Sequence, residues 1–380
     1  MSPLGFRTYN IASLVIVNNI LLISDEFPPK GGGAGTIAMR LAKDLQLLGH
    51  AVTLISGDEG KESPENVMHI KVHRSTLIWP LAYRKVFREI ELSNFDQIIL
   101  NDFVSVYLAG LFFDIKNLKK SIVIIHGADS KFAFARVSAK HMVFLYKRFY
   151  ARALRYCGCV VAVSQYAKEF FLQHVPGDLT INKINCAYAG IEIDDFDDGF
   201  SINKKDIGLP DDAKIMFTAC RLTEDKGIFT QLELFKKISR NNSSLYWVVA
   251  GYGRDGERFK NAVSDAGLEG KIILVGKIPR KHIGAYYKLA ELFWMLSARE
   301  GETMGLVYLE AALFGTPSIG YERYGVKEAI LSGESGFFYN DASFENDVDY
   351  CLSHDMAESC KSFASTFKTI KFAEYLLSES

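Results

Sequence analysis

The stretch NILLISDEFPPKGGGAGTIAMRLAKDLQLLGHAVTLIS, residues 19–56, decides the fold class, because it reads as strand, glycine-rich loop, helix and strand. Asn19–Ser24 and Ala51–Ser56 are short apolar runs of the kind that form buried strands. Between them, Thr36–Leu48 carries apolar residues at a helical period, and Gly49 suits the position just after a helix. Two strands joined through one helix predict a βαβ unit in a parallel sheet.

The same alternation continues along the chain and predicts two sheets. Further strands are expected at Gln97–Leu100, Ser121–His126, Val160–Ser164, Lys214–Ala219, Leu245–Ala250, Lys271–Val275, Leu292–Leu296 and Thr316–Gly320, with a helix at Ile228–Ile238. The segment IEIDDFDDGF interrupts the series, because it is acidic and has no period. We therefore expect an α/β protein with domains at 1–190 and 201–360, and a linker at 191–200.

Charge is balanced over the whole chain and unbalanced within it. The 380 residues hold 44 Lys and Arg against 45 Asp and Glu. Residues 1–185 have 22 basic and 15 acidic side chains, a net charge of +7, so the remainder has a net charge of −8. The overall balance argues against a strongly basic nucleic-acid-binding protein, and we expect no nucleic-acid partner.

The cysteines and the lengths of the apolar runs indicate in which cellular compartment the protein is expected. Six cysteines show no metal-binding spacing, which suits reduced thiols in a cytoplasmic protein. No apolar run reaches the roughly 18 residues of a membrane span, and the run Ile11–Val17 lacks the flanks of a signal peptide. We expect a cytoplasmic protein.

Two glycine-rich loops follow predicted strands. The first, with Gly32 and Gly33, would let the backbone approach a phosphate or sugar at a helix start; a flexible turn is the alternative. The second, Gly251-Tyr-Gly253-Arg-Asp-Gly256, matches a dinucleotide-binding pattern, yet no carboxylate ends the next strand. Gly251 and Gly253 are therefore expected to line a nucleotide cleft of another kind.

Two further loops carry charged groups. Arg221 and Lys226 flank a tight turn and suit the two sides of a diphosphate, although a solvated loop has the same pattern. In GETMGLVYLEAALFGTPSIG, residues 301–320, Glu302 and Glu310 stand eight positions apart, about two helical turns. A carboxylate on an apolar helix face needs donors such as a sugar diol, and the Thr303–Gly305 amides suit an anion at the helix start. Helix capping by Glu302 and a surface position for Glu310 are the alternatives.

These motifs together resemble the retaining glycosyltransferases of family 4. They are the Gly32-Gly33 loop, Arg221 with Lys226-Gly227, Gly251 and Gly253, and Glu302-x7-Glu310 followed by Gly315-Thr-Pro317. The resemblance runs from about Leu21 to Tyr339 and is nearest to bacterial mannosyl- and N-acetylhexosaminyltransferases. It implies the GT-B fold, in which two Rossmann-like parallel-sheet domains face each other across a cleft. It also implies that a final helix, 361–380, returns to the first domain.

The resemblance implies roles for individual residues. Catalysis would involve His126, Arg221, Lys226 and Glu302, with the two cations holding the donor diphosphate in place of a metal. The donor would also be bound by Gly32, Gly33, Gly251, Gly253, Lys277, Ile278, Thr303, Met304, Gly305, Leu306 and Glu310, the last at the ribose hydroxyls. No metal and no cofactor are expected. The sequence departs from the family at Tyr324-Gly325-Val326-Lys327-Glu328, where paired glycines and Pro-Glu are usual, and at Ala189-Gly190.

The function that follows is transfer of a sugar, with retention, from a nucleotide diphosphate sugar to a hydroxyl. The donor is expected to be either GDP-mannose or a UDP-hexose or UDP-N-acetylhexosamine. The acceptor would be a glycan or lipid-linked molecule of bacterial surface polysaccharide or glycolipid synthesis. A nucleotide-sugar epimerase or hydrolase of the same fold and a non-catalytic nucleotide-sugar-binding subunit are the alternatives.

A basic and aromatic stretch in the first half of the chain suggests a membrane-binding surface. No Asp or Glu occurs from Ser130 through Lys168. Within 131–155 the cations are Lys131, Arg136, Lys140, Lys147, Arg148, Arg152 and Arg155. This pattern suits a helix lying on an anionic membrane, and it equally suits a packed helix with a solvated basic face. The first interpretation places the protein peripherally on the inner face of the cell membrane.

Overall fold

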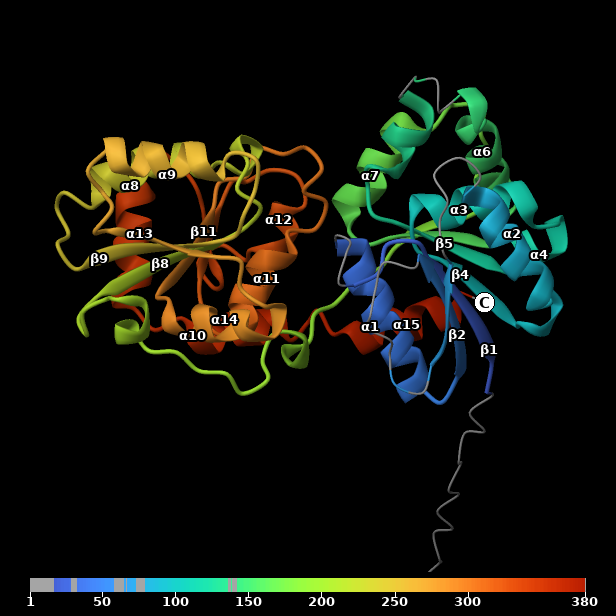
Figure 1. Cartoon of the computed structure of the whole chain (residues 1–380), viewed down its shortest axis with the longest axis horizontal. Coiled ribbons are helices and arrows are strands. Elements are labelled where there is room, and N and C mark those ends of the chain that lie inside the picture. Colours follow the sequence, from blue (N-terminus) through green and yellow to red (C-terminus); the bar gives the residue numbers. More distant parts are fainter. Residues whose placement is uncertain are drawn as a thin grey trace, which may run out of the picture.

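The structure is a computed structural model and describes residues 17–28, 33–57, 65, 67–72, 79–135, 138 and 142–379. The chain forms two parallel sheets, each with helices on both faces, set side by side (Figure 1). This arrangement confirms the predicted α/β class and the two facing Rossmann-like domains.

The first sheet has the strand order β3-β2-β1-β4-β5-β6-β7. Its strands are β1 (Asn19–Ser24), β2 (Ala51–Gly57), β3 (Met68–Val72), β4 (Gln97–Leu100), β5 (Ser121–Ile125), β6 (Cys159–Ala162) and β7 (Ile184–Cys186). Its helices are α1 (Gly33–Leu47), α2 (Trp79–Glu89), α3 (Phe103–Phe112), α4 (Ile115–Lys119), α6 (Tyr146–Tyr156) and α7 (Gln165–His174). The central strands are apolar and buried because helices cover both faces.

The second sheet has the order β10-β9-β8-β11-β12-β13. Its strands are β8 (Lys214–Ala219), β9 (Leu245–Ala250), β10 (Ile272–Gly276), β11 (Leu292–Met295), β12 (Ser318–Gly320) and β13 (Gly336–Phe338). Its helices are α8 (Ile228–Ile238), α9 (Gly256–Asp265), α10 (Ile283–Leu289), α11 (Leu306–Leu313), α12 (Val326–Ala329), α13 (Phe344–Ser353) and α14 (Ala357–Ala364). Among the described residues, no helix has both the length and the apolar composition that crossing a bilayer requires.

The predicted strands agree with the structure to within two residues at each end, and three edge strands were not predicted. These are β3, β7 and β13, and β7 and β13 have three residues each. An edge strand is held through its backbone on one side, so its side chains need not form an apolar run.

The acidic linker packs onto both domains. On the first-domain side, Asp195 lies 3.7 Å from the Arg40 guanidinium of α1. On the second-domain side, Asp197 pairs with Lys288 and Phe196 is buried against Phe314. The cluster of acidic residues that marks the linker in the sequence therefore supplies ion pairs that fix its course.

The final helix begins later than the predicted range 361–380. Residues 361–364 are the end of α14, which packs on α11 in the second domain. Lys368 is extended, which breaks the helix, and α15 (Thr369–Ser378) then packs on α1 in the first domain. The break is required because the chain passes from one domain to the other between these helices.

The two passages between the domains touch at Gly190. The Ile191 amide donates to the Phe367 carbonyl oxygen at 2.9 Å. A Cβ added at Gly190 would stand 2.3 Å from the Lys368 carbonyl carbon and from the Thr369 nitrogen. Glycine is required here because two backbones cross in contact.

We expect Gly190→Ala to lower the free energy of unfolding by about 1–3 kcal/mol, the usual cost of forcing an extra carbon into a packed site. Thermal unfolding followed by circular dichroism measures the loss as a lower Tm. Gly177→Ala is the control, since a Cβ there meets no atom within 4 Å. Equal Tm values for the two variants would contradict the packing described for the crossing.

Candidate functional site

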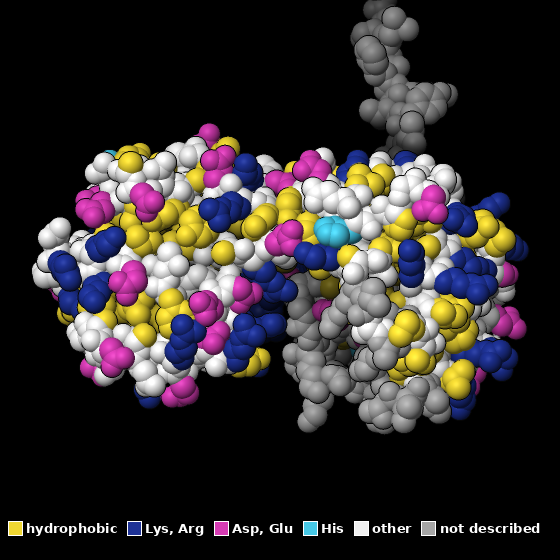
Figure 2. All heavy atoms as spheres, turned by 90° about the horizontal axis from the view of Figure 1, so that it is seen from above, with side chains coloured by type: hydrophobic (Ala, Val, Ile, Leu, Met, Phe, Trp, Pro, Cys, Tyr) yellow, Lys and Arg dark blue, Asp and Glu magenta, His cyan; other side chains and the backbone are white. Residues whose placement is uncertain are grey.

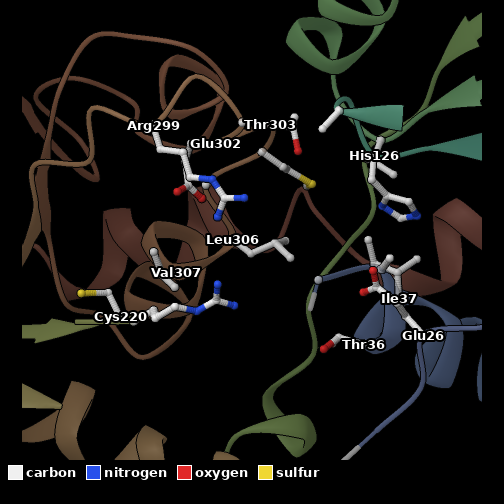
Figure 3. Close-up of a pocket in the computed structure, with 18 of the residues that line it drawn as sticks. Glu26, Thr36, Ile37, His126, Cys220, Arg299, Glu302, Thr303, Leu306 and Val307 are labelled. Carbon is white, nitrogen blue, oxygen red and sulfur yellow. The ribbon is translucent and has the colours of Figure 1, made fainter. Parts of the chain in front are cut away.

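A cavity of about 1030 Å³ lies where the two domains face each other. Figure 3 shows His126, Glu26 and Ile37 on one wall and Arg299, Glu302 and Leu306 on the other. Both walls are built at the carboxyl ends of parallel strands, the usual position of ligand sites in such sheets.

The Arg221 and Lys226 side chains line the second-domain wall. Arg221 follows β8 and is exposed to the cavity. Lys226 ends a short 3-10 helix and is followed by Gly227 with φ +81°, where a Cβ would stand 2.0 Å from the Leu296 carbonyl oxygen. This close approach holds the loop against the end of β11.

Lys226 is tied to Glu302. Its ammonium donates to the Glu302 carboxylate, and both side chains are largely buried. The Ser297 hydroxyl lies 3.5 Å from the same carboxylate. An ion pair of this kind fixes both groups at the wall, so the predicted cation and carboxylate lie in one place.

Gly251 and Gly253 do not line the cavity in the part of the chain that the structure describes. A Cβ at Gly251 would stand 1.8 Å from the Cys220 carbonyl oxygen, and one at Gly253 would stand 2.2 Å from that of Leu222. The glycines therefore let the turn after β9 support the Arg221 loop. Lys277 and Ile278 also lie outside the lining residues, and the Lys277 ammonium stands 5.5 Å from the Tyr252 ring.

Thr303, Met304, Gly305 and Leu306 all line the cavity at the start of α11. Gly305 precedes the helix with φ +68°, a conformation that favours glycine. The unpaired amides of a helix start carry a partial positive charge, which favours an anion in front of them.

Glu310 is buried on α11 and reaches the cavity. Burial raises the pKa of this carboxyl, and the positive charge of Arg280 opposes the rise. The Tyr287 hydroxyl donates to it at 3.1 Å, and an Arg280 nitrogen lies 3.7 Å from its other oxygen. The buried carboxylate thus has two partners of its own and still faces the cavity.

His126 follows β5 on the first-domain wall. Its Nε2 lies 2.6 Å from the Asn101 carbonyl oxygen, which only accepts, so Nε2 carries the proton. Its backbone amide donates to Asp129 at 2.9 Å, and burial raises the pKa of Asp129. These bonds fix the direction of the imidazole.

The glycine-rich loop is described only in part. Gly33 begins α1 and lines the cavity opposite Leu306, whose Cδ1 would be 3.8 Å from a Cβ there. Gly32 lies outside the described residues, as do Arg136 and Lys140 of the basic stretch.

Several lining residues were not predicted from the sequence. On the second-domain wall these are the cations Arg254, Arg280 and Arg299. On the first-domain wall they are the carboxylates Asp25, Glu26, Asp102 and Asp129. Each follows a strand end within a few residues, and this position in the sequence is the signal that could have identified them. In Figure 2, Lys and Arg side chains border the hollow between the domains on the second-domain side.

The part of the basic stretch on α6 lines a groove on the first domain. A groove of about 630 Å³ is lined by Ile115, Leu145, Lys147, Arg148, Ala151, Arg152, Arg155 and Tyr156. Arg152 donates to the backbone carbonyls of Gly110 and Phe113, whereas Lys147, Arg148 and Arg155 are exposed. Ile115 and Leu145 are exposed apolar side chains in the same lining, so cations and apolar groups share this groove.

Both halves of the chain match known family profiles. Residues 31–195 match the profile described as Glycosyltransferase Family 4, and residues 200–366 match that described as Glycosyl transferases group 1.

The relatives are distant. The amylovoran biosynthesis glycosyltransferase AmsK of Erwinia amylovora is 27% identical over 223 residues, which are 57% of this chain and 51% of that protein. The chain thus matches about half the length of that relative. The alpha-monoglucosyldiacylglycerol synthase of Streptococcus pneumoniae is 22% identical over 333 residues, 84% of this chain and 74% of that protein.

Solved structures show the same fold. Anabaena HepE, crystallised with UDP and glucose, superposes with a TM-score of 0.71 at 17% identity, over 95% of this chain and 98% of that chain. The two family matches together cover most of both domains, and the chain belongs to glycosyltransferase family 4, with the two-domain GT-B fold.

Proposed function

We propose that the chain is a retaining glycosyltransferase that moves a sugar from a nucleotide diphosphate sugar to a hydroxyl acceptor. The observation that carries this proposal is the convergence of Arg221, Lys226, Glu302 and the Thr303–Gly305 amides on one cavity wall. Cations and helix-start amides on one wall suit a diphosphate.

The costly step of such a transfer is departure of the nucleoside diphosphate, which separates charge. Arg221, Lys226 and the amides at the start of α11 would stabilise the departing phosphates, and the proposal needs no metal. The departing phosphate would take the proton of the acceptor hydroxyl on the same face, so the sugar keeps its configuration. His126 would approach the donor sugar from the opposite wall.

Donor and acceptor are proposed by class. Glu310 would accept from the ribose hydroxyls of GDP-mannose or of a UDP-hexose or UDP-N-acetylhexosamine. The names of the Erwinia and Streptococcus relatives support a glycan or lipid-linked acceptor in bacterial surface polysaccharide or glycolipid synthesis. We place the enzyme in the cytoplasm, where nucleotide sugars would reach it.

Lys226→Ala tests the diphosphate clamp. We expect kcat to fall about 10²- to 10³-fold, the usual effect of removing one preorganised donor to developing negative charge. Release of nucleoside diphosphate in the presence of acceptor measures it, with Lys237→Ala on the exposed face of α8 as control. Unchanged kcat in Lys226→Ala would overturn the assignment, and a product formed without acceptor would indicate an epimerase or hydrolase.

Glu310→Gln tests nucleotide binding. We expect the Kd for UDP or GDP to rise about 10-fold or more, because a charge-assisted hydrogen bond contributes about 1.5–3 kcal/mol. The affinity of the unaltered protein for UDP or GDP should also fall as pH is lowered. Because the pKa of Glu310 is raised, its carboxylate takes up a proton at a higher pH than an ordinary glutamate does. Calorimetric titration measures both, with exposed Glu345 changed to Gln as control. Equal Kd values for the two variants would remove Glu310 from the nucleotide site.

Peripheral docking on an anionic membrane is the second part of the proposal. Its support is the groove on α6, where Lys147, Arg148 and Arg155 surround apolar groups. Yellow and dark blue side chains alternate on the exposed face of the first domain in Figure 2. Such a surface would present the active cleft to a lipid-linked acceptor.

Vesicle flotation tests this docking. We expect the chain to float with phosphatidylglycerol vesicles and not with phosphatidylcholine vesicles, and binding should weaken with salt because surface charges are screened. The triple variant K147E/R148E/R155E should stay in the dense fraction. The control variant K237E/R240E/K260E changes the charge equally on exposed second-domain positions. Equal flotation of both triple variants would contradict docking through this groove.

A further inference from the structure

The two domains meet at a second place besides the crossing at Gly190. This contact, here called the rim, joins the start of α7 to the loops after β11 and β12, and α7 and α12 face each other across it in Figure 1. Its first-domain members are Lys131, Ser164, Gln165 and Tyr166, and its second-domain members are Glu300, Thr303, Tyr324 and Glu328.

Glu328 of the second domain accepts hydrogen bonds from the first amides of α7 in the first domain. Its two carboxylate oxygens accept from the Gln165 amide at 2.8 Å and the Tyr166 amide at 2.7 Å. These are the first two amides of a ten-residue helix, and a helix leaves such amides without partners of its own. A carboxylate at this position makes charge-assisted bonds and suits the positive end of the helix dipole.

The same rim touches the Glu302–Gly305 loop of the cavity. The Ser164 hydroxyl donates to the Thr303 carbonyl oxygen. Gly127, with φ +108°, leaves room for Thr303, whose Cγ2 would be 2.1 Å from a Cβ there. The first domain therefore packs directly against the loop that carries the amides of the site.

Gly325 links Glu328 to this loop. The Gly325 amide donates to the Glu302 carbonyl oxygen at 2.9 Å, and a Cβ at Gly325 would stand 2.2 Å from the Thr303 carbonyl oxygen. α12 starts at the next residue and carries Glu328. A shift of α12 would therefore move the backbone that rests on Glu302 and Thr303.

Tyr324 is held in a conformation that favours glycine. Its φ is +55°, and its ring lies 5.4 Å from that of Tyr166, centroid to centroid. A tyrosine in this backbone conformation is strained, and the ring contact with the other domain offsets the strain. The chain thus keeps a strained residue where it contacts the start of α7.

We propose that Glu328 is a positioning residue, which with Tyr324 couples contact at the rim to the geometry of the Glu302–Gly305 loop. The proposal rests on the function proposed above for that loop. The sugar-side part of the cavity is then complete only when α7 is docked, whereas Arg221 and Glu310 hold the nucleotide from the second domain alone. Loss of the rim should impair transfer and leave nucleotide binding nearly unchanged.

The main test is Glu328→Gln in the full chain, with Glu322→Gln as control, because Glu322 lies 3.7 Å from Lys327 on the same domain. We expect kcat for sugar transfer to fall about 10-fold and the Kd for UDP or GDP to change less than 2-fold. Hydrogen exchange followed by mass spectrometry should show faster exchange in residues 300–306 as well as at the start of α7. A helix cap without coupling would change exchange at α7 alone, and that result would overturn the proposal.

Tyr324→Gly separates positioning from stability. The variant removes the strained conformation, so Tm should stay equal or rise, yet kcat should fall and residues 300–306 should exchange faster. Unchanged exchange in that segment would contradict the coupling. The exchange measurement needs only UDP or GDP, so it tests the coupling even if no donor sugar is transferred. Failure of the coupling and failure of the proposed transfer activity can therefore be told apart.

Discussion

The contact of two backbones at Gly190 is the constraint on which the rest of the structure depends. Both passages between the domains run through this point, and the Ile191 amide bonds the Phe367 carbonyl oxygen. The chain passes between the domains twice at this point, and this crossing and the rim together hold the carboxyl ends of the two sheets facing each other. The cavity, with Glu302 on one wall and His126 on the other, lies between the sheet ends held in this way.

The charge of each domain is reversed at the cavity. The first half of the chain has a net charge of +7, yet its wall carries Glu26, the buried Asp102 and the half-buried Asp129. The second half is acidic, yet its wall carries cations, namely Arg221, Lys226, Arg254, Arg280 and Arg299. Coulomb interactions in a cleft depend on the nearest groups, so total charge says little about what either wall binds.

The sequence predicts elements correctly where burial on both faces requires apolar residues. It does not predict elements or contacts that are held by backbone atoms alone. The strands near the centre of each sheet, such as β1 and β8, are apolar because both faces are covered, and their bounds were predicted. The edge strands β7 and β13 are held by backbone bonds over three residues, too few for a pattern. A close backbone approach requires glycine whatever comes close. The sequence could not distinguish a ligand from the Cys220 carbonyl at Gly251.

The helix α15 gives the first domain an unusual order of assembly. Its Leu376 carbonyl accepts from the buried Gln97 side chain at the start of β4, and Thr369 accepts from Arg40 of α1. These partners, Leu376 and Thr369, follow the whole second domain along the chain. The second domain has all its strands and helices before α15 is synthesised, so the domain that is translated first is the last to complete its core.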